Sequence, residues 1–311
     1  MYYYCTLFNK NYLTRGLAMI ESLCNHAQDF HLYILAFDEE TFTYLSTLRN
    51  YPITTIRLSD FEDEELLTVK SARTLAEYCW TCTPAIIQYC ISTFLLPHCT
   101  YIDADVFFFK NPNLLIDEMQ TNSILLTKHN YAQQYQYFQN TSGTYCVQFM
   151  CFKADKDGLN ALAWWKQKCL EWCFARFEDG KFGDQKYLDD WTERFEGVYV
   201  PSNTKYALAP WNIVEHAEAE CIFYHFHNLY FIGEDKVDLG GYKIPKSAKI
   251  QIYTPYIKSL IELRIKFLPH NYDLRSKQKL TLLHILRTLK RYFYGTYNVF
   301  YLTDFTQQLN A

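Results

Sequence analysis

The chain has 311 residues, of which 49% are hydrophobic, and a formal net charge of -4. This composition supplies a sizeable core, and a weakly acidic chain offers no electrostatic reason to bind nucleic acid. The start, MYYYCTLFNK, lacks the pattern of a secretion signal, and no apolar run reaches the ~18 residues of a membrane-spanning helix. We therefore expect a cytoplasmic protein whose eleven cysteines are mostly reduced, small apolar side chains.

The first half of the chain alternates strand-like and helix-like segments, which is typical of βαβ proteins and predicts a doubly wound sheet flanked by helices. Strands are predicted at residues 2–8, 31–37 and 53–58, and helices at about residues 13–24, 39–48, 66–80 and 84–95. The next strand ends at two aspartates. Later strands are predicted at residues 124–128, 145–152 and 221–226, and later helices at about residues 156–177 and 184–191.

No linker rich in Gly, Ser or Pro divides the chain, and no internal repeat is visible. The simplest division is one α/β domain over residues 1–245 and a mostly helical C-terminal extension over residues 246–311. Within the extension, KQKLTLLHILRTLKRYF predicts an amphipathic helix with apolar residues near one face and several basic residues. We expect this helix either to pack on the main domain or to contact an anionic membrane surface at its inner face.

The stretch TYIDADVFFFKNP, residues 100–112, places two aspartates inside an apolar run. Asp103 and Asp105 follow a predicted strand, and ligands of open α/β sheets bind beyond the carboxyl ends of strands. Two residues apart on an extended chain, their side chains point to the same side and can reach one cation. Because a buried charge is costly without a partner, we expect Mg²⁺ or Mn²⁺ here. The alternative is a polar strand end whose aspartates cap the next turn.

Basic and imidazole side chains elsewhere favour the metal interpretation. In the apolar strand that ends YHFHNL, His225 and His227 share one face, which suits a metal ligand or a phosphate donor. Lys70 and Arg73 are three residues apart and are predicted to share a helical face with Glu77. Taken singly, His225 and His227 would be ordinary core histidines, and Lys70 and Arg73 would belong to a solvated surface. Together with the acidic pair they predict a site for a metal-bound diphosphate.

Several segments resemble nucleotide-sugar-dependent glycosyltransferases of the GT-A fold, especially the family 8 type. TYIDADVFFFKNP resembles their D-x-D signature, and YCTLFNKNYLTRGLAMIESL is similar to their opening strand, nucleoside-binding loop and helix. KSARTLAEYCW resembles the helix before the metal motif, FGDQKYLDDW the acidic-Gln helix start near the donor sugar, and YHFHNL the late histidine motif. The resemblance covers roughly residues 2–230 and implies a Rossmann-like mixed sheet flanked by helices.

This resemblance implies a metal-dependent enzyme that transfers a hexosyl or N-acetylhexosaminyl group from a nucleotide-diphosphate sugar, expected to be UDP-linked. The acceptor would be a glycan, a lipid-linked molecule or a protein, as in the biosynthesis of a bacterial-type surface polysaccharide. Asp103 would lie near ribose and metal, and Asp105 would hold the metal. One or both of His225 and His227 would complete the metal's ligand shell.

The same resemblance assigns the remaining site residues. The residues expected to line the nucleoside pocket are Cys5, Thr6, Asn9 and Asp38. Lys70 and Arg73 would bind sugar or phosphate oxygens. Asp184 would lie beside the sugar with Gln185 next to it, and would orient the acceptor, act as a base or stabilise the cationic sugar. Trp211 and Asn212 would offer a ring and an amide to the sugar, with buried packing as the alternative for Trp211.

Three other classes of protein compete with this interpretation. A haloacid-dehalogenase-like phosphatase also places D-x-D at a strand end, and Asp189 and Asp190 would supply its later acidic pair, but Phe107 stands where that family has Thr or Val. A sugar nucleotidylyltransferase needs a Gly-rich N-terminal loop for triphosphate, where this chain has LFNKN. A non-catalytic sugar- or nucleotide-binding module on the same scaffold is the third alternative.

Overall fold

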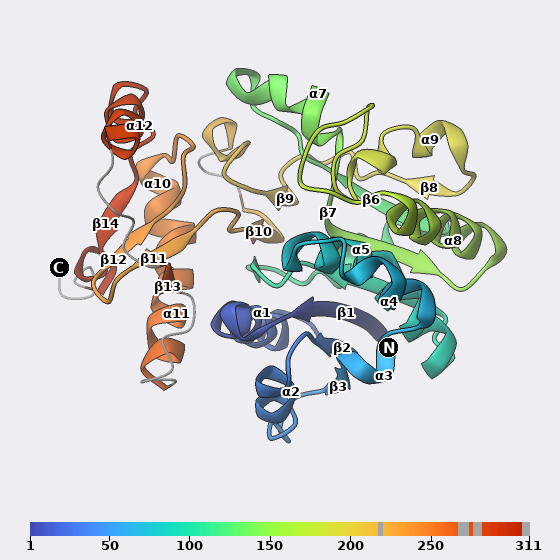
Figure 1. The fold of residues 1–311 in the computed structure, drawn as a ribbon. Coiled ribbons are helices and arrows are strands. Elements are labelled where there is room, and N and C mark those ends of the chain that lie inside the picture. The colour runs from blue at the N-terminus through green and yellow to red at the C-terminus, as the bar shows by residue number, and fades with distance from the viewer. Residues whose placement is uncertain (217–219, 267–273, 276–281, 307–311) are drawn as a thin grey trace.

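A seven-stranded mixed sheet forms the centre of the protein (Figure 1). The structure is a computed structural model and describes residues 1–216, 220–266, 274–275 and 282–306. The order of the strands is β3-β2-β1-β4-β7-β6-β8. Their bounds are β1 (Tyr2–Phe8), β2 (Phe30–Ala36), β3 (Ile53–Arg57), β4 (His98–Ile102), β6 (Ile124–Lys128), β7 (Tyr145–Lys153) and β8 (Val198–Tyr199).

The N-terminal half of the sheet is parallel and its other half is mixed. Strands β1 to β4 pair in parallel, whereas β7 runs antiparallel to both β4 and β6. Parallel neighbours need crossover connections, and α1 (Leu13–His26) and α2 (Glu39–Leu45) provide the first two. The predicted α/β class, with a mixed sheet flanked by helices, is confirmed.

Side chains of the central strands alternate between two apolar clusters that include different helices. On β1, Tyr4 and Phe8 belong to the cluster that includes α1, and Cys5 and Leu7 belong to the cluster that includes α5 (Leu75–Phe94). Successive side chains of a strand point to opposite faces of the sheet. Apolar clusters on both faces therefore explain why β1 is apolar nearly throughout.

The predicted helix boundary before Pro84 is wrong. The helical chain breaks instead between α4 (Glu64–Lys70) and α5, where Thr74 and Glu77 form a capping box. Pro84 lies inside α5, and its buried neighbours on that helix show that tertiary packing outweighs the hydrogen bond that proline cannot make. Lys70 and Arg73 therefore do not share one helical face with Glu77.

Two other predicted helices are shorter than expected. Helix α8 (Lys156–Glu171) ends before residue 177, because the chain turns back and the backbone N–H of Ala175 donates to the Glu77 carboxylate at 2.8 Å. The predicted helix over residues 184–191 is wrong as well. That segment contains only the 3-10 turn η3 (Lys186–Leu188), and the one-turn helix α9 (Trp191–Arg194) follows.

A small second sheet, in the order β5-β10-β9, lies directly after the acidic motif. Its strands are β5 (Val106–Phe108), β9 (Ala207–Leu208) and β10 (Phe223–His225). Strand β10 runs antiparallel to β5, and its register pairs His225 with Val106. Because Val106 immediately follows Asp105, this register brings the late histidine motif to the acidic motif.

The C-terminal part of the chain combines helices with a four-stranded sheet. The sheet has the order β13-β11-β12-β14, with β11 (Tyr230–Ile232), β12 (Lys236–Asp238), β13 (Leu274–Arg275) and β14 (Val299–Tyr301). The helices are α10 (Lys246–Ala248), the π-helix η5 (Lys249–Tyr253), α11 (Thr254–Lys266), α12 (Leu282–Phe293) and α13 (Thr303–Thr306). Helix α11 packs against α1, so the C-terminal part of the chain lies next to α1 (Figure 1). The sheet thus joins strands from both sides of residue 245.

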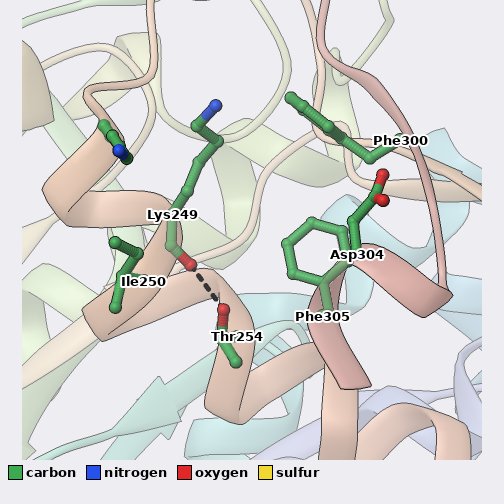
Figure 2. Close-up of a pocket in the computed structure, with 7 residues that line it drawn as sticks. Lys249, Ile250, Thr254, Phe300, Asp304 and Phe305 are labelled. Carbon is green, nitrogen blue, oxygen red and sulfur yellow. Dashed lines mark hydrogen bonds between the residues drawn. The ribbon is translucent and has the colours of Figure 1, made fainter. Parts of the chain in front are cut away.

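The extension contains a cavity of about 320 Å³ between η5 and α13 (Figure 2). Phe305 is buried at its wall, and the ammonium group of Lys249 lies 4.6 Å from the centre of the Phe300 ring. The carbonyl oxygen of Lys249 accepts a hydrogen bond from the Thr254 hydroxyl at 2.8 Å. In the part of the chain that the structure describes, no helix has both the length and the apolarity needed to cross a bilayer.

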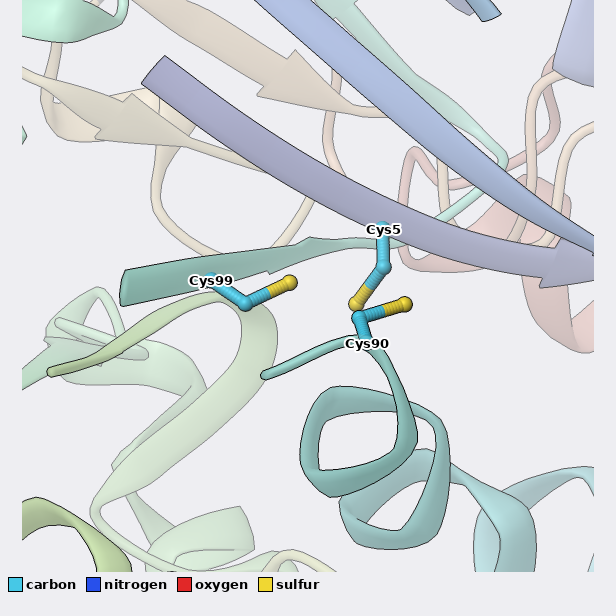
Figure 3. A group of neighbouring side chains, drawn as sticks. All are labelled: Cys5, Cys90 and Cys99. Atoms are coloured by element: carbon cyan, nitrogen blue, oxygen red, sulfur yellow. The ribbon is translucent and has the colours of Figure 1, made fainter. Parts of the chain in front are cut away.

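Cysteine side chains fill part of the core. Cys5 on β1, Cys90 on α5 and Cys99 on β4 are fully buried, and their sulfur atoms lie within 4.8 Å of one another (Figure 3). All eleven cysteines are free thiols, as the sequence predicts. Burial raises the pKa of the Cys5 thiol well above its usual value, so Cys5 behaves as an apolar packing residue.

We predict that Gly16→Ala destabilises the protein, because a Cβ at this position of α1 would lie 2.5 Å from the buried Phe8 ring. The helix-propensity gain of about 1 kcal/mol is smaller than an expected overpacking penalty of about 1–3 kcal/mol. Urea unfolding monitored by circular dichroism measures the difference. Gly241→Ala is the control, since a Cβ at that position would have no described atom within 4 Å. Equal stability of the two variants would contradict the packing described for Phe8.

Candidate metal centre

The two aspartates of the acidic motif lie in the turn between β4 and β5. The backbone N–H of Val106 donates to the carbonyl oxygen of Asp103 at 3.2 Å, which closes the turn. Asp105 is buried, and Asp103 is partly exposed. The Tyr101 hydroxyl donates to Asp103 Oδ1 at 3.0 Å and fixes the orientation of that carboxylate. The turn therefore presents one oriented and one buried carboxylate side by side.

His225 on β10 reaches both carboxylates. Its Nε2 lies 3.1 Å from Asp105 Oδ1 and 3.7 Å from Asp103 Oδ2. Its Nδ1 lies 2.9 Å from Oε1 of Gln148, a buried residue of β7. One ligand atom from each of Asp103, Asp105 and His225 lies within 4.8 Å of the others. We call this group the Asp-His cluster.

Electrostatics within the Asp-His cluster are strongly coupled. Burial raises the pKa of Asp103 to about 6, and the Asp105 charge adds to this effect while His225 opposes it. Burial also disfavours the charge of Asp105, but His225 outweighs it and lowers the Asp105 pKa to about 2. Burial disfavours the imidazolium of His225, yet the two carboxylates raise its pKa well above the usual value. Without a metal, the imidazolium balances the acidic pair.

The donor set of the Asp-His cluster fits a divalent cation. Carboxylate oxygens and one imidazole nitrogen are ligands that Mn²⁺ and Mg²⁺ accept. The three groups come from the β4–β5 turn and from β10, and the pairing of His225 with Val106 brings them together. A metal would replace the proton on His225 Nε2 as the positive partner of the carboxylates.

His227 lies beside His225 and is not one of the three residues of the Asp-His cluster. Its ring centre is 5.8 Å from that of His225 and 5.6 Å from that of Trp211. Burial, with the charge of His225, lowers the pKa of His227 to about 4, so His227 is neutral. Trp211 is buried and its indole N–H donates to the carbonyl oxygen of His129 at 2.7 Å. The ring of Trp211 thus forms a wall against both histidines.

Asp184 is a further buried carboxylate near the cluster. Burial and then the charge of Asp103 raise its pKa to about 8, so it carries a proton at neutral pH. The side chain of the neighbouring Gln185 donates to the carbonyl oxygen of Ser142 at 2.8 Å. The amide of Asn212 is also occupied, since it donates to the carbonyl oxygen of His129 at 3.0 Å.

The residues predicted for the nucleoside pocket order the loop after β1. The carboxylate of Asp38 accepts hydrogen bonds from the backbone N–H groups of Lys10 at 2.8 Å and Thr41 at 2.7 Å. The Asn9 side chain accepts one from the N–H of Asn11 at 3.1 Å. The buried hydroxyl of Thr6 finds no hydrogen-bond partner among the described residues. Cys5, by contrast, belongs to the cysteine group of Figure 3.

The two predicted diphosphate-binding cations have protein partners. Lys70 Nζ lies 2.6 Å from the Glu62 carboxylate. The guanidinium of Arg73 donates to the carbonyl oxygens of Leu170 and Cys173, both at 2.7 Å. Arg73 therefore ties the start of α5 to the end of α8, a role that the sequence did not indicate.

Sequence reasoning missed Arg15 and Gln148. The charge of Arg15 contributes to the lowered pKa of Asp105, and its guanidinium donates to the carbonyl oxygen of Leu229 at 2.8 Å. Arg15 is buried on α1, and Gln148 interrupts the apolar run YCVQFMCF. In each case, a charged or amide side chain at an otherwise apolar position could have marked the residue as part of the site.

Comparison with solved structures identifies the fold as that of GT-A glycosyltransferases. The galactosyltransferase LgtC, solved with donor and acceptor sugar analogues, matches with a TM-score of 0.55 at 11% identity, over 86% of this chain and 98% of LgtC. The bifunctional glycosyltransferase WbbM matches with a TM-score of 0.56 at 12% identity, over 85% of this chain and 51% of WbbM. At these identities the likeness establishes the fold alone. No protein-family model matches the chain.

The chain belongs to the family of the Bacillus subtilis (strain 168) proteins YfnD and YfnF. It is 31% identical to YfnD over 275 residues, which are 83% of this chain and 88% of YfnD. It is 32% identical to YfnF over 253 residues, which are 75% of this chain and 84% of YfnF. Both relatives are described as uncharacterized proteins. The similarity therefore shows common ancestry, and the activity has to be inferred from the site.

We predict that Asp184→Asn stabilises the metal-free protein at pH 8 and has little effect at pH 4. The folded-state pKa is raised to about 8 from the ordinary 3.8, so the unfolded chain gives up this proton first and wild-type stability falls as pH rises between these values. The melting temperature of the variant at pH 8 should exceed that of the wild type by at least about 2 °C. Calorimetry at both pH values measures this.

The matched control for this prediction is Asp179→Asn, at an exposed position of left-handed backbone that asparagine also adopts. Its melting temperature should follow the wild type at both pH values. A melting temperature of Asp184→Asn that does not rise relative to the wild type between pH 4 and pH 8 would show that Asp184 ionises freely.

Proposed function

We propose that the protein is a metal-dependent glycosyltransferase of the family 8 type that transfers a hexosyl or N-acetylhexosaminyl group from a nucleotide-diphosphate sugar, with UDP as the nucleotide. The acceptor is a glycan, a lipid-linked molecule or a protein, consistent with polysaccharide biosynthesis. One observation carries the proposal: the Asp-His cluster lies at the carboxyl end of β4 in a GT-A fold. This is the edge at which open α/β sheets bind ligands.

In this proposal the metal ligands are Asp105 and His225, with Asp103 at the metal and ribose. A bound Mn²⁺ or Mg²⁺ supplies charge neutralisation for the departing nucleoside diphosphate. His227 lies next to His225 and is neutral, which keeps it eligible as a further ligand. Tyr101 orients Asp103 through its hydroxyl.

The nucleotide is proposed to bind at the loop after β1. Thr6 has a buried hydroxyl with no hydrogen-bond partner among the described residues, and Asp38 and Asn9 order the loop. Cys5 is buried in the core on the strand before this loop and contributes by packing. Arg15 is the best-supported cation for the diphosphate because its charge already acts on Asp105. Lys70 and Arg73 remain proposed donor-binding residues that would first leave the partners described above.

Asp184 and Gln185 are proposed to lie at the donor sugar. A carboxyl group that is protonated at neutral pH donates a hydrogen bond to a sugar oxygen, and this favours orientation of sugar or acceptor over direct proton abstraction. Gln185 is anchored to Ser142 and holds the segment that presents Asp184. Residues 1–245 would then form the catalytic domain, and residues 246–311 an extension that completes it.

The extension is also proposed to hold the enzyme at the inner face of a membrane. Helix α12 exposes Ile285, Leu286, Leu289 and Phe293, the last being 96% exposed. Its Arg291 binds the Asp238 carboxylate through two hydrogen bonds, at 2.6 and 2.7 Å, and so fixes the helix to β12. Leu286, Leu289 and Phe293 belong to the apolar face that the sequence predicts, and all three are exposed. The other two residues of that predicted face, Leu280 and Leu283, lie outside the described side chains. An exposed apolar face next to basic residues suits an anionic lipid surface.

We predict that UDP binds the wild-type protein only weakly without Mn²⁺ and at least about tenfold more tightly with it, since the metal joins the diphosphate to the carboxylates. Asp105→Ala should lose this metal-dependent gain while keeping its fold. Isothermal titration calorimetry measures both affinities, and thermal melts check folding. Asp60→Ala, at an exposed carboxylate of α3 (Leu58–Phe61), is the control.

Absence of UDP binding by the folded wild type at saturating Mn²⁺ would contradict the uridine donor. The next ligands would then be other nucleoside diphosphates and, after them, phosphatase substrates. Metal-dependent binding that survives in Asp105→Ala would contradict the assignment of the metal to the Asp-His cluster.

We predict that the protein co-sediments with phosphatidylglycerol vesicles more than with phosphatidylcholine vesicles, and that Leu289→Glu reduces the bound fraction several-fold. The substituted carboxylate would have to enter the lipid interface beside anionic headgroups. Leu114→Glu is the control, because Leu114 is comparably exposed on α6 (Asn113–Asp117), outside the extension. Equal sedimentation of the two variants would contradict membrane contact through α12.

A further inference from the structure

Gln148 contacts both parts of the Asp-His cluster. It lies on β7 inside the apolar run YCVQFMCF and is only 1% exposed. Its side-chain oxygen lies 2.9 Å from His225 Nδ1, and its backbone carbonyl accepts the N–H of Asp103 at 3.1 Å. A buried amide is costly unless its polar atoms are hydrogen-bonded. The partner of this amide is the imidazole that faces the carboxylates.

The hydrogen bond to Gln148 determines which ring nitrogen of His225 is available to a metal. An amide oxygen can only accept, so Nδ1 must carry the proton in this contact. A neutral imidazole has one protonated nitrogen, and with the proton held at Nδ1 the lone pair is at Nε2. Nε2 is the atom that lies 3.1 Å from Asp105. The proton is thus held on the side away from the carboxylates.

The orientation of the ring is also constrained from other sides. The ring of Trp211 meets the His225 ring edge-on, with 5.5 Å between ring centres and 88° between planes. The indole N–H of Trp211 is occupied by the carbonyl oxygen of His129, so Trp211 supplies a wall and no competing hydrogen bond. The thiol of Cys146 also lies within reach of the imidazole. Of these neighbours, Gln148 is the one that accepts the hydrogen bond from Nδ1 and so fixes the tautomer.

An amide suits this position better than the carboxylate that often supports a ligand histidine. Asp103, Asp105 and Asp184 already place three buried or half-buried carboxyl groups in this region. A further buried negative charge would be repelled by them. The neutral oxygen of Gln148 accepts the same hydrogen bond without adding charge.

We infer that Gln148 is a positioning residue that prepares His225 for metal binding by holding the proton on Nδ1 and the ring plane toward the acidic pair. This inference rests on the proposed function, because the metal is part of it. Outer partners of ligand histidines fix tautomer and orientation in this way, and their loss typically weakens metal binding about 10–100-fold.

The test compares Mn²⁺ binding by the full chain in three variants, with the metal alone as the ligand. Gln148→Leu removes the acceptor at similar volume and should weaken Mn²⁺ binding about 10–100-fold in calorimetric titrations. Gln148→Glu restores an acceptor but adds a buried negative charge, so it should recover only part of the loss. Thr127→Val, on the neighbouring strand, removes the buried hydroxyl that donates to the carbonyl oxygen of Cys146 at 3.3 Å, and should bind as the wild type does.

Nitrogen-15 spectra of histidine-labelled wild type with Mg²⁺ report the tautomer directly and do not depend on any variant. Protonated Nδ1 at His225 is expected, and protonated Nε2 in the metal-bound protein would overturn the inference. Mn²⁺ affinity that is unchanged in folded Gln148→Leu, or lowered equally in Thr127→Val, would overturn it while leaving the metal site intact. A wild type that binds no Mn²⁺ would overturn the proposed function and this inference with it.

Discussion

Two adjacent carboxylates in the β4–β5 turn, one of them buried, are the constraint on which the rest of the structure depends. Asp103 and Asp105 cannot both be ionised in an apolar environment without a cation. The fold supplies one by placing His225 Nε2 3.1 Å from Asp105 Oδ1. That contact requires β10 to run antiparallel to β5 with His225 opposite Val106. This register cannot shift without separating the charges.

Sequence patterns predicted the elements whose signal is local. The first strand matches its predicted bounds, and the D-x-D pair stands at a strand end as its position indicated. The predictions failed where tertiary packing overrides propensity, as at Pro84 inside α5. Residues 184–191 also fail as a helix: Asp184 is buried at the start of the segment, and only the short 3-10 turn η3 follows it before α9.

The candidate site was predictable only in part, for a physical reason. Acidic and imidazole residues at strand ends can be recognised in the sequence. The residues that hydrogen-bond to them come from distant segments. Gln148 and His225 are 77 residues apart, and nothing local to either residue indicates the contact. Arg73 shows the reverse error: its charge suggested a ligand-binding role, whereas its guanidinium binds two backbone carbonyls. Residue type predicted the chemistry, and only the fold showed which groups meet.

Crystals grown with Mn²⁺ and UDP give the most direct measurement of whether the Asp-His cluster is a metal-dependent nucleotide site. Anomalous scattering at the manganese edge locates the ion independently of any assumption about its ligands. We expect one strong peak bound by the Asp105 carboxylate and His225 Nε2 and in contact with the diphosphate. UDP bound in this region with no manganese at these residues, or manganese held elsewhere on the chain, would contradict the metal-dependent site.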